Sequence, residues 1–191
     1  MKKRRRHIKK LKDLAAKDEI DVWFMDECHF QQHGSRLTAW FHKDEKDPIL
    51  RHASTRKKVG IIGAVKANDG TLVACEEDKF NAQTIEAFFT ELVAHREAGK
   101  TMVVILDNAR FHHAKALSGW LEKHSETFRL DFLPPYSPEL NHIERVWKFL
   151  RRHCTHNQYF ENLDNLRQAV FAKIIEWASP NEDLAQLCAI T

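Results

Sequence analysis

Two acidic residues stand directly after short apolar runs of the kind that form buried strands. Asp26 follows "VWFM" and Asp107 follows "VVIL". Polar function gathers at the carboxyl ends of buried parallel strands, so neighbouring strands would bring Asp26 and Asp107 to one edge of a sheet. Two carboxylates held close together repel each other unless they are protonated or bridged by cations. Oxygen ligands favour a hard cation such as Mg²⁺ or Mn²⁺, although either acid alone is also typical of a strand that leaves the core for solvent.

A third acid, Glu144, lies in the stretch "PPYSPELNHIERVW", residues 134–147. Ser137 is a good N-cap and Pro138 suits the first helical position, so we predict a helix from Ser137. Glu144 borders the apolar stripe of this helix, with Asn141 one turn before it and Lys148 one turn after it. It can reach a neighbouring cleft, or it can be a surface carboxylate paired with Lys148, and helical position does not separate the two. The stripe consists of Leu140, Ile143, Trp147 and Leu150.

The remaining sequence predicts the elements that position these acids. Strands are predicted over residues 20–27, 34–41, 56–67, 72–80, 101–108 and 128–134, and helices over residues 81–99, 114–124 and 162–178 and from Ser137. The first four strands read as an antiparallel meander, with the turn "ANDGT" before the last of them. Asn81 is the expected N-cap and Gly99 the expected end of the first long helix. The order of elements predicts an α/β fold whose sheet mixes antiparallel and parallel strands.

Composition and charge describe one globular domain with a basic beginning. The chain has 191 residues, 43% hydrophobic and 30% charged, and no apolar run of the roughly 20 residues that span a bilayer. Residues 1–12 hold eight of the 30 Lys and Arg and no acid, which leaves 22 basic and 27 acidic side chains in the rest of the chain. A basic arm indicates an anionic polymer as partner, a solvated end or a linker remnant. We expect the arm over residues 1–19, the main domain over 20–178, a tail over 179–191, and a cytoplasmic protein with reduced cysteines.

Three motifs, "FMDE", "LDNARFHH" and "PPYSPELNHIERVW", resemble the catalytic core of mariner-type transposases. The likeness is greatest to the bacterial insertion-sequence branch of that superfamily, and it covers roughly residues 20 to 155. The gap between the second and third acids is 36 residues, within the range expected of this group. The motif positions fall on Asp26 and Glu27, on Asp107, Asn108 and His112, and on Tyr136 through Glu144.

The resemblance implies a ribonuclease-H-like fold with a five-stranded mixed sheet and a catalytic triad of Asp26, Asp107 and Glu144. In the family's chemistry the triad binds two Mg²⁺ ions, for which Mn²⁺ can substitute, on either side of the scissile phosphate. Asp26 would bridge the two ions, while Asp107 and Glu144 would each complete the shell of one. Water then cuts the end of the element, and the freed 3′-OH attacks target DNA.

Other residues are assigned to the site by the same resemblance. Glu27, Asn108, His112 and Asn141 are expected to support the triad. For Asn108 and His112 three roles remain open: positioning of the loop, contact with the phosphate, and a purely structural role.

The candidate DNA contacts are Arg4, Arg5, Arg6, Lys57, Arg145, Lys148, Arg151 and Arg152, for which a solvated basic surface is the alternative. The partners implied are the DNA of transposon ends and target, with a homodimer expected by resemblance only, no membrane, and a location beside the bacterial nucleoid. The clusters "CHFQQH" and "HCTH" lack convincing partners for zinc.

The chain departs from the family in two places. His142 stands where the family usually has Pro, and only about 20 residues precede the first strand, where helix-turn-helix modules normally lie. We therefore expect a catalytic half, a second reading frame of a split element or a truncated relic, with the DNA-binding modules missing or on a separate chain. Two other functions compete with a transposase: a ribonuclease-H-like nuclease that only hydrolyses, and an inactive relic or recruited DNA-binding module.

Overall fold

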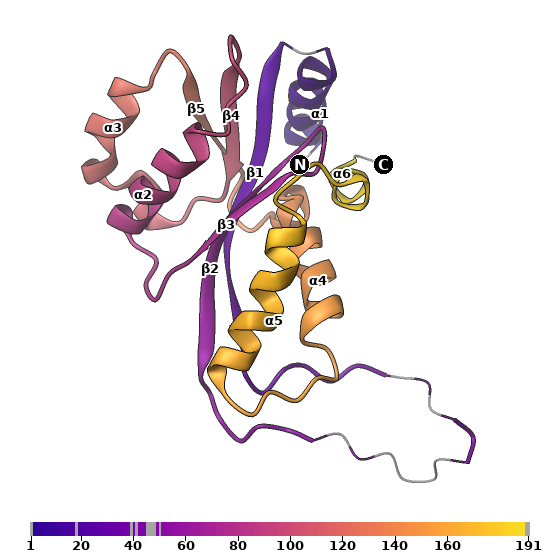
Figure 1. Ribbon diagram of the computed structural model, residues 1–191. Helices are drawn as coiled ribbons and strands as arrows, with labels where there is room; N and C mark the ends of the chain where they lie inside the picture. Colours follow the sequence, from indigo (N-terminus) through magenta and orange to yellow (C-terminus); the bar gives the residue numbers. More distant parts are fainter. Residues whose placement is uncertain are drawn as a thin grey trace.

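The centre of the computed structural model is one five-stranded mixed sheet (Figure 1). The strands are β1 (Ile20–Gln31), β2 (Lys58–Lys66), β3 (Leu72–Glu76), β4 (Thr101–Leu106) and β5 (Phe128–Phe132). They lie in the order β3-β2-β1-β4-β5; β1 pairs antiparallel with β2, as does β2 with β3, whereas β1 pairs parallel with β4, as does β4 with β5. The structure describes residues 2–17, 19–38, 40, 42–44, 49 and 51–189. The predicted α/β class, an antiparallel meander plus parallel strands, is confirmed.

Helices cover both faces of this sheet, because its central strands are apolar on both sides. The helices are α1 (Lys2–Ala16), α2 (Ala82–Val93), α3 (Ser118–Lys123), α4 (Ile143–Cys154), α5 (Leu163–Glu176) and α6 (Glu182–Cys188), with 3₁₀ helices η1 (Arg110–His113), η2 (Lys115–Leu117) and η3 (Pro138–Leu140). Trp23 and Met25 of β1 pack on the side of α2 and α3, while Val22 and Phe24 pack on the side of α1, α4, α5 and α6 (Figure 1). Within the described ranges, no helix has the length and apolar character needed to cross a bilayer.

Both ends of the chain pack on the same core as the rest. Helix α1 buries Ile8, Leu11 and Ala15, which are 1–3% exposed, and Asn68 donates to the carbonyl of Ala15 at 2.8 Å. Apolar residues at this spacing line one face of a helix, although the basic residues between them dominate the sequence. Helix α6, expected to be part of a tail, likewise has two fully buried side chains. The division into arm, catalytic domain and tail stays a prediction. The core is continuous across both of its boundaries, because α1 and α6 contribute to the same hydrophobic cluster as the rest.

The strand predicted over residues 34–41 is not seen in the described part of that segment. Ser35 makes an isolated bridge to His156, and the side chains of Leu37 and Trp40 are 50% and 102% exposed. The apolar residues here have no layer to pack against, so local pattern alone does not form a strand. The prediction for this segment was wrong over its described residues.

The predicted helix from Ser137 is also divided. η3 ends at Leu140, Asn141 is extended with φ −90° and ψ 105°, and α4 begins only at Ile143. Ser137 makes no capping hydrogen bond; the side chain of Asn141 instead donates to the carbonyl of Met25 at 2.8 Å. This tertiary bond holds the chain extended where the local pattern favours helix. Two other helices are shorter than predicted: α2 ends at Val93, and residues 114–124 divide into η2 and α3.

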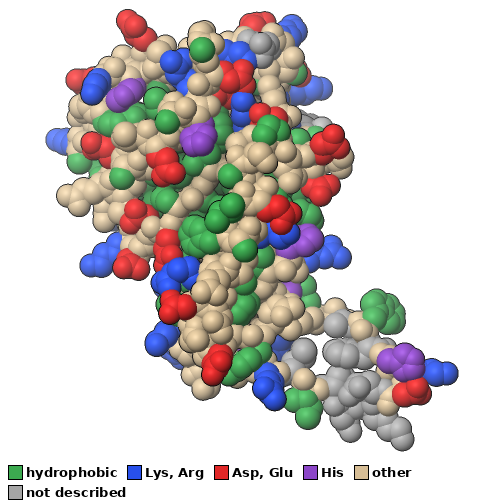
Figure 2. Space-filling view, viewed as in Figure 1, with side chains coloured by type: hydrophobic (Ala, Val, Ile, Leu, Met, Phe, Trp, Pro, Cys, Tyr) green, Lys and Arg blue, Asp and Glu red, His purple; other side chains and the backbone are tan. Residues whose placement is uncertain are grey.

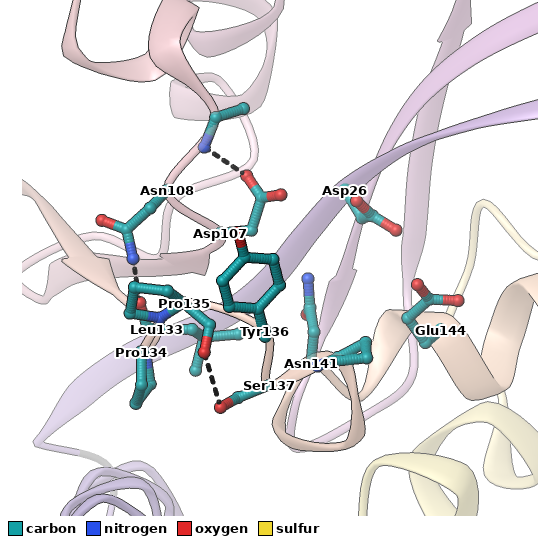
Figure 3. Close-up of a pocket in the computed structure, with 12 residues that line it drawn as sticks. Asp26, Asp107, Asn108, Leu133, Pro134, Pro135, Tyr136, Ser137, Asn141 and Glu144 are labelled. Carbon is teal, nitrogen blue, oxygen red and sulfur yellow. Dashed lines mark hydrogen bonds between the residues drawn. The ribbon is translucent and has the colours of Figure 1, made fainter.

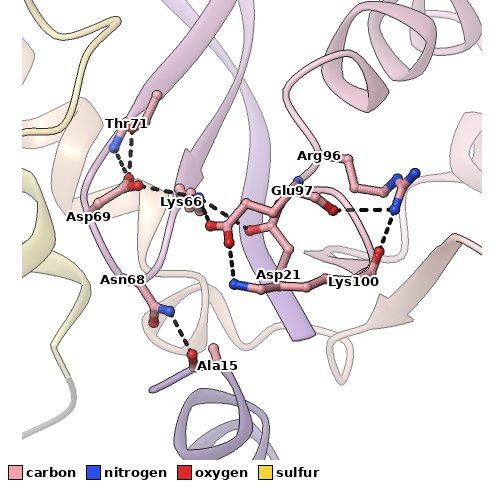
Figure 4. A network of polar contacts seen from close by, with 9 residues as sticks. All are labelled: Ala15, Asp21, Lys66, Asn68, Asp69, Thr71, Arg96, Glu97 and Lys100. Atoms are coloured by element: carbon pink, nitrogen blue, oxygen red, sulfur yellow. Dashed lines mark hydrogen bonds and ion pairs between the residues drawn. The ribbon is translucent and has the colours of Figure 1, made fainter. Parts of the chain in front are cut away.

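A partly buried ionic network joins the amino end of β1 to its surroundings (Figure 4). Lys66 at the end of β2 lies 3.8 Å from Asp21 and 3.3 Å from Asp69, and it also pairs with Glu97, which in turn pairs with Lys100. Burial raises the pKa of Asp21 despite the nearby Lys66 ammonium. The network fixes the turn after β2 and the loop before β4 against β1, five residues before Asp26.

Candidate active site

The three predicted acids line one cavity of about 470 Å³ at the carboxyl edge of the parallel strands (Figure 3). Asp107 directly follows β4, and Glu144 lies in the first turn of α4.

Asp26 lies within β1 rather than at its end, which corrects the prediction that this strand stops at the acids. The pairing of β1 with β4 ends at Phe24, but β1 continues alongside β2, where Asp26 faces Gly63. Asp26 therefore stands just beyond the point where the pairing of β1 with β4 ends. The other lining residues are Asn108, Ala109, Leu133, Pro134, Pro135, Tyr136, Ser137, Pro138 and Asn141.

Negative charge concentrates around Asp26. Burial, together with the carboxylates of Glu27, Glu144 and Asp107, raises the pKa of Asp26 to about 8. The field of these carboxylates favours a cation or a proton at this position. The alternative for Glu144, a surface carboxylate paired with Lys148, is not seen: this pair is not among the ion pairs of the described residues, and Lys148 is exposed.

Asp107 is held by its own loop and by a buried histidine. Its Oδ1 accepts from the backbone N–H of Ala109 at 2.9 Å and lies 3.2 Å from Nδ1 of His112, so the carboxylate turns toward that loop (Figure 3). The hydrogen bond from His112 is the largest cause that lowers the pKa of Asp107. Consistent with this orientation, no three acidic, His or Cys side chains of the described chain converge closely enough to hold a metal ion.

His112 bridges two carboxylates. Its Nε2 lies 2.9 Å from Oε1 of Glu27, and the side chains of His112 and Glu27 are only 1% and 8% exposed. Burial alone would lower the pKa of His112, but the hydrogen bonds to Asp107 and Glu27 outweigh it and raise that pKa to about 9. A protonated His112 donates from both ring nitrogens, so it links β1 to the loop after β4.

Two asparagines tie the loops of the cavity to the sheet. The side-chain amide of Asn108 donates to the carbonyl of Leu133, and its oxygen lies 3.2 Å from Nε2 of His113. Asn141 binds the carbonyl of Met25, one residue before Asp26, while its own Oδ1 is buried with no hydrogen-bond partner among the described residues. The four expected supporting residues, Glu27, Asn108, His112 and Asn141, thus all lie around the triad, although their roles remain predictions.

The candidate DNA contacts are dispersed. Arg145 donates to the carbonyls of Leu187 at 2.9 Å and Ala189 at 3.1 Å, and the guanidinium of Arg151 lies 5.3 Å from the centre of the Phe30 ring. Arg6, Lys57, Lys148 and Arg152 are exposed, and the side chains of Arg4 and Arg5 lie outside the described residues. On the face shown in Figure 2, basic and acidic side chains are intermixed on the surface. Their role in binding DNA stays a prediction.

Tyr136 was not predicted as a site residue. It lies at the rim of the cavity, is 102% exposed and has a φ of 55°, an uncommon conformation for a residue other than glycine. Such strain is often stored at functional sites. Its place in the Tyr-Ser-Pro motif is the sequence signal that marks it.

Comparison with known proteins identifies the family. A model of the DDE superfamily endonuclease matches residues 21–167. The "Insertion element IS630 uncharacterized 39 kDa protein" of Shigella sonnei is 27% identical over 162 residues, which are 85% of this chain and 46% of that protein. The protein y4pE/y4sA of Sinorhizobium fredii is 31% identical over 106 residues, which are 56% of this chain and 75% of that protein.

Solved structures of the Mos1 mariner transposase share the fold. The Mos1 strand transfer complex superposes with a TM-score of 0.65 at 15% identity, covering 97% of this chain and 56% of that one. The Mos1 paired-end complex with Mn gives a TM-score of 0.65 at 15% identity over 87% of this chain and 51% of that one. The chain thus spans about half the length of the IS630 protein and of these transposase chains. The family read from the three motifs is confirmed, and the chain belongs to the DDE superfamily endonucleases.

Proposed function

We propose that this chain is the catalytic domain of a transposase that cuts DNA at the ends of a mobile element and joins the freed 3′-OH to target DNA. The observation that carries the proposal is the meeting of Asp26, Asp107 and Glu144, from three distant segments, in one cavity of a DDE superfamily endonuclease. Phosphoryl transfer needs mainly positioning and charge neutralisation, which carboxylates and a cation supply together.

The donor set of the cavity fits divalent cations. Asp26, Asp107 and Glu144 offer only oxygen, which suits Mg²⁺ or Mn²⁺; Asn141 also lines the cavity, and its buried Oδ1 has no hydrogen-bond partner among the described residues. Asp26, Asp107 and Glu144 would be the residues that hold the ions. When bound, the ions would neutralise charge on the scissile phosphate and favour ionisation of the attacking water.

The residues of the chain itself position the reacting groups. His112 holds Glu27 and Asp107, and Asn141 holds the start of α4 against β1, so that Glu144 faces Asp26 across the cavity. In the first step the oxygen of water bonds to phosphorus and the bond from phosphorus to the 3′-oxygen breaks, which leaves a 3′-OH and a 5′-phosphate. In the second step that 3′-OH bonds to a target phosphorus and the target's own 3′-oxygen leaves.

DNA is the partner that this chemistry requires. The Mos1 structures include a paired-end complex with the left transposon end and a strand transfer complex, and we infer an equivalent DNA partner here. We further infer that recognition of the element ends depends on a region beyond the matched half, on this or another chain, and that two copies act together. A location beside the bacterial nucleoid follows from the same proposal.

Wild-type protein should nick supercoiled plasmid in Mn²⁺ and join a labelled, pre-cut 3′-OH oligonucleotide from an element end to that plasmid, with no product in EDTA. Gel separation of nicked and joined products gives the measurement. Nicking without joining would instead favour a nuclease that only hydrolyses. Failure of both reactions, even after the remaining half of the protein is added, would favour an inactive relic.

Neutralising part of the basic helix should weaken DNA binding. Replacing Arg6, Lys9 and Lys10 with Gln removes three exposed cations while sparing Lys12, which binds the carbonyl of Cys188. The slope of log K against log salt for duplex DNA should fall by up to about 0.9 for each phosphate that the variant no longer neutralises. Fluorescence anisotropy from about 50 to 200 mM salt provides the measurement.

The matched control for this triple variant replaces Lys115, Lys123 and Arg129, three exposed cations on or next to α3 and β5. It changes the net charge by the same amount as the α1 variant. If DNA binding depends on the cations of α1 rather than on net charge, the control should keep a salt slope near that of the wild type. An unchanged slope in the α1 variant would mean that Arg6, Lys9 and Lys10 do not contact DNA phosphates.

A further inference from the structure

The carbonyls at the end of α6 are hydrogen-bonded by two residues close to Glu144, one two positions before it and one directly after it. Before Glu144, Nδ1 of His142 donates to the carbonyl of Cys188 at 2.8 Å. After Glu144, Arg145 donates to the two adjacent carbonyls, those of Leu187 and Ala189. The backbone that carries Glu144 is therefore held to α6 on both sides.

A third donor reaches the same end of α6 from the other end of the chain. The ammonium of Lys12 on α1 also binds the carbonyl of Cys188. The last four carbonyls of a helix lack partners within it, and the helix dipole places partial negative charge there. Two cationic side chains and one imidazole N–H donate hydrogen bonds to the carbonyls at this end of α6. These bonds join α1, α4 and α6 at one point.

Helix α6 is itself fixed to the sheet. Its N-cap Asn181 accepts from the backbone N–H of Leu184, and the N–H of Asn181 donates to the carbonyl of Asp69 at 2.7 Å. A Cβ on Gly70 would lie 2.2 Å from the carbonyl oxygen of Asn181, so the turn after β2 and the start of α6 are in close contact. A helix of seven residues has little stability of its own. Its position is set by these contacts and by the buried side chains of Leu184 and Cys188.

The start of α4 depends on these contacts because it has no cap of its own. His142 occupies the N-cap position without a side-chain capping bond, and its ring stacks on Phe24 of β1 with centroids 4.4 Å apart. Asn141 binds the carbonyl of Met25 on the same strand. Proline at position 142, which the family resemblance leads one to expect, could not donate to Cys188.

We propose that the end of α6 is a brace that positions Glu144 for the reaction, with His142 and Arg145 as its positioning residues. The α6 brace comprises the carbonyls of Leu187, Cys188 and Ala189 and the side chains of Lys12, His142 and Arg145. The inference rests on the proposed function, since it assigns Glu144 to the metal-dependent site. It adds a dependence of that site on the last helix, more than 40 residues further along the chain.

Two substitutions at His142 separate the hydrogen bond from the ring contact. His142→Asn keeps an N–H donor near the position of Nδ1, whereas His142→Phe keeps the ring on Phe24 and removes the donor. Loss of a group that orients a metal ligand typically costs about 10–100-fold in metal affinity or activity, and we expect losses in that range for His142→Phe and Arg145→Met. His142→Asn should retain most of the wild-type values. Lys123→Met, on the exposed surface of α3, is the control for loss of a cation.

The readouts are Mn²⁺ affinity by electron paramagnetic resonance, cleavage rate, and the rate at which Cys188 is alkylated. Cys188 is 0% exposed, so its labelling requires the end of α6 to open, and peptide mass spectrometry distinguishes it from the other three cysteines. If α6 and Glu144 are coupled, Mn²⁺ must slow alkylation of Cys188 in the wild type, because coupling between two sites is reciprocal. Glu144→Gln should abolish that protection.

The outcomes distinguish the brace from the proposed function. Wild-type Mn²⁺ affinity and cleavage in both His142→Phe and Arg145→Met would overturn the brace and leave the function standing. If these variants unfold, the wild type alone decides: protection of Cys188 by Mn²⁺ supports the brace, and its absence overturns it. A wild type that neither binds Mn²⁺ nor cleaves DNA, even with the remaining half of the protein added, would overturn the function and the brace with it.

Discussion

Glu144→Gln is expected to abolish metal-dependent DNA cleavage while leaving the fold intact. The substitution keeps the size of the side chain and removes only its charge. A cation at a phosphoryl oxygen supplies several kcal/mol of transition-state stabilisation, so losing one of its carboxylate ligands should lower the rate by about 10³-fold. The free energy of unfolding should change little, because Glu144 makes no ion pair with another of the described residues. Removing a carboxylate near Asp26 also relieves repulsion.

The measurement is the rate of plasmid nicking in Mn²⁺, with thermal unfolding of the same preparation. Glu139→Gln is the matched control: it makes the same chemical change five residues earlier, on η3, at an exposed position that does not line the cavity. Glu139→Gln should cleave like the wild type. Full activity in Glu144→Gln would remove this residue from the site, whereas equal losses in both variants would point to a general effect of charge.

The parts of the fold that were predicted from the sequence have strong local signals. The apolar runs before Asp26 and Asp107 are short and rich in β-branched or aromatic residues, which favours buried strands, and α2 has both the apolar period and the Asn81 cap. Helix α6 was missed because seven residues carry too little periodicity. Its position is determined by the turn at Asp69 and Gly70, which lies more than 100 residues away.

The three acids that were predicted to meet do line one cavity, but the orientation of their carboxylates was not predicted. The motifs placed three acids together, yet no local rule predicts that the carboxylate of Asp107 turns to Ala109 and His112. The same holds for the break before α4, which depends on the bond from Asn141 to Met25, 116 residues away. In both cases a tertiary hydrogen bond overrides the local preference of the backbone.

Gly63 shows how closely the core and the site are coupled. It is the antiparallel partner of Asp26, and a Cβ at this position would lie 2.5 Å from Cη2 of Trp147 and 3.3 Å from the Cβ of Ala74. Trp147 is fully buried, and it lies one turn after Glu144 on α4. The absence of a side chain at position 63 therefore lets α4 approach β2 closely beside the cavity.

Gly63→Ala should consequently lower both stability and cleavage. The indole of Trp147 is fully buried, and overpacking in a core costs about 1–3 kcal/mol. For a domain of this size each kcal/mol lowers Tm by about 2–4 °C. A shift of α4 also moves Glu144, and a misplacement of about 1 Å in an active site can cost about 10²-fold in rate. Thermal unfolding and plasmid nicking measure the two effects.

Two further variants test whether the indole of Trp147 is the cause. Gly119→Ala lies in α3, where a Cβ meets nothing within 4 Å, so it should be neutral or raise stability by up to about 1 kcal/mol. Adding Trp147→Phe to Gly63→Ala shortens the ring that the new methyl group meets, and it should recover part of the lost cleavage even though Trp147→Phe alone leaves a cavity. If Gly63→Ala unfolds at the wild-type temperature and cleaves at the wild-type rate, α4 can move away from the sheet without loss of stability or activity. Glu144 would then be placed by its contacts with α6 and Asn141 rather than by the packing of Trp147 on the sheet.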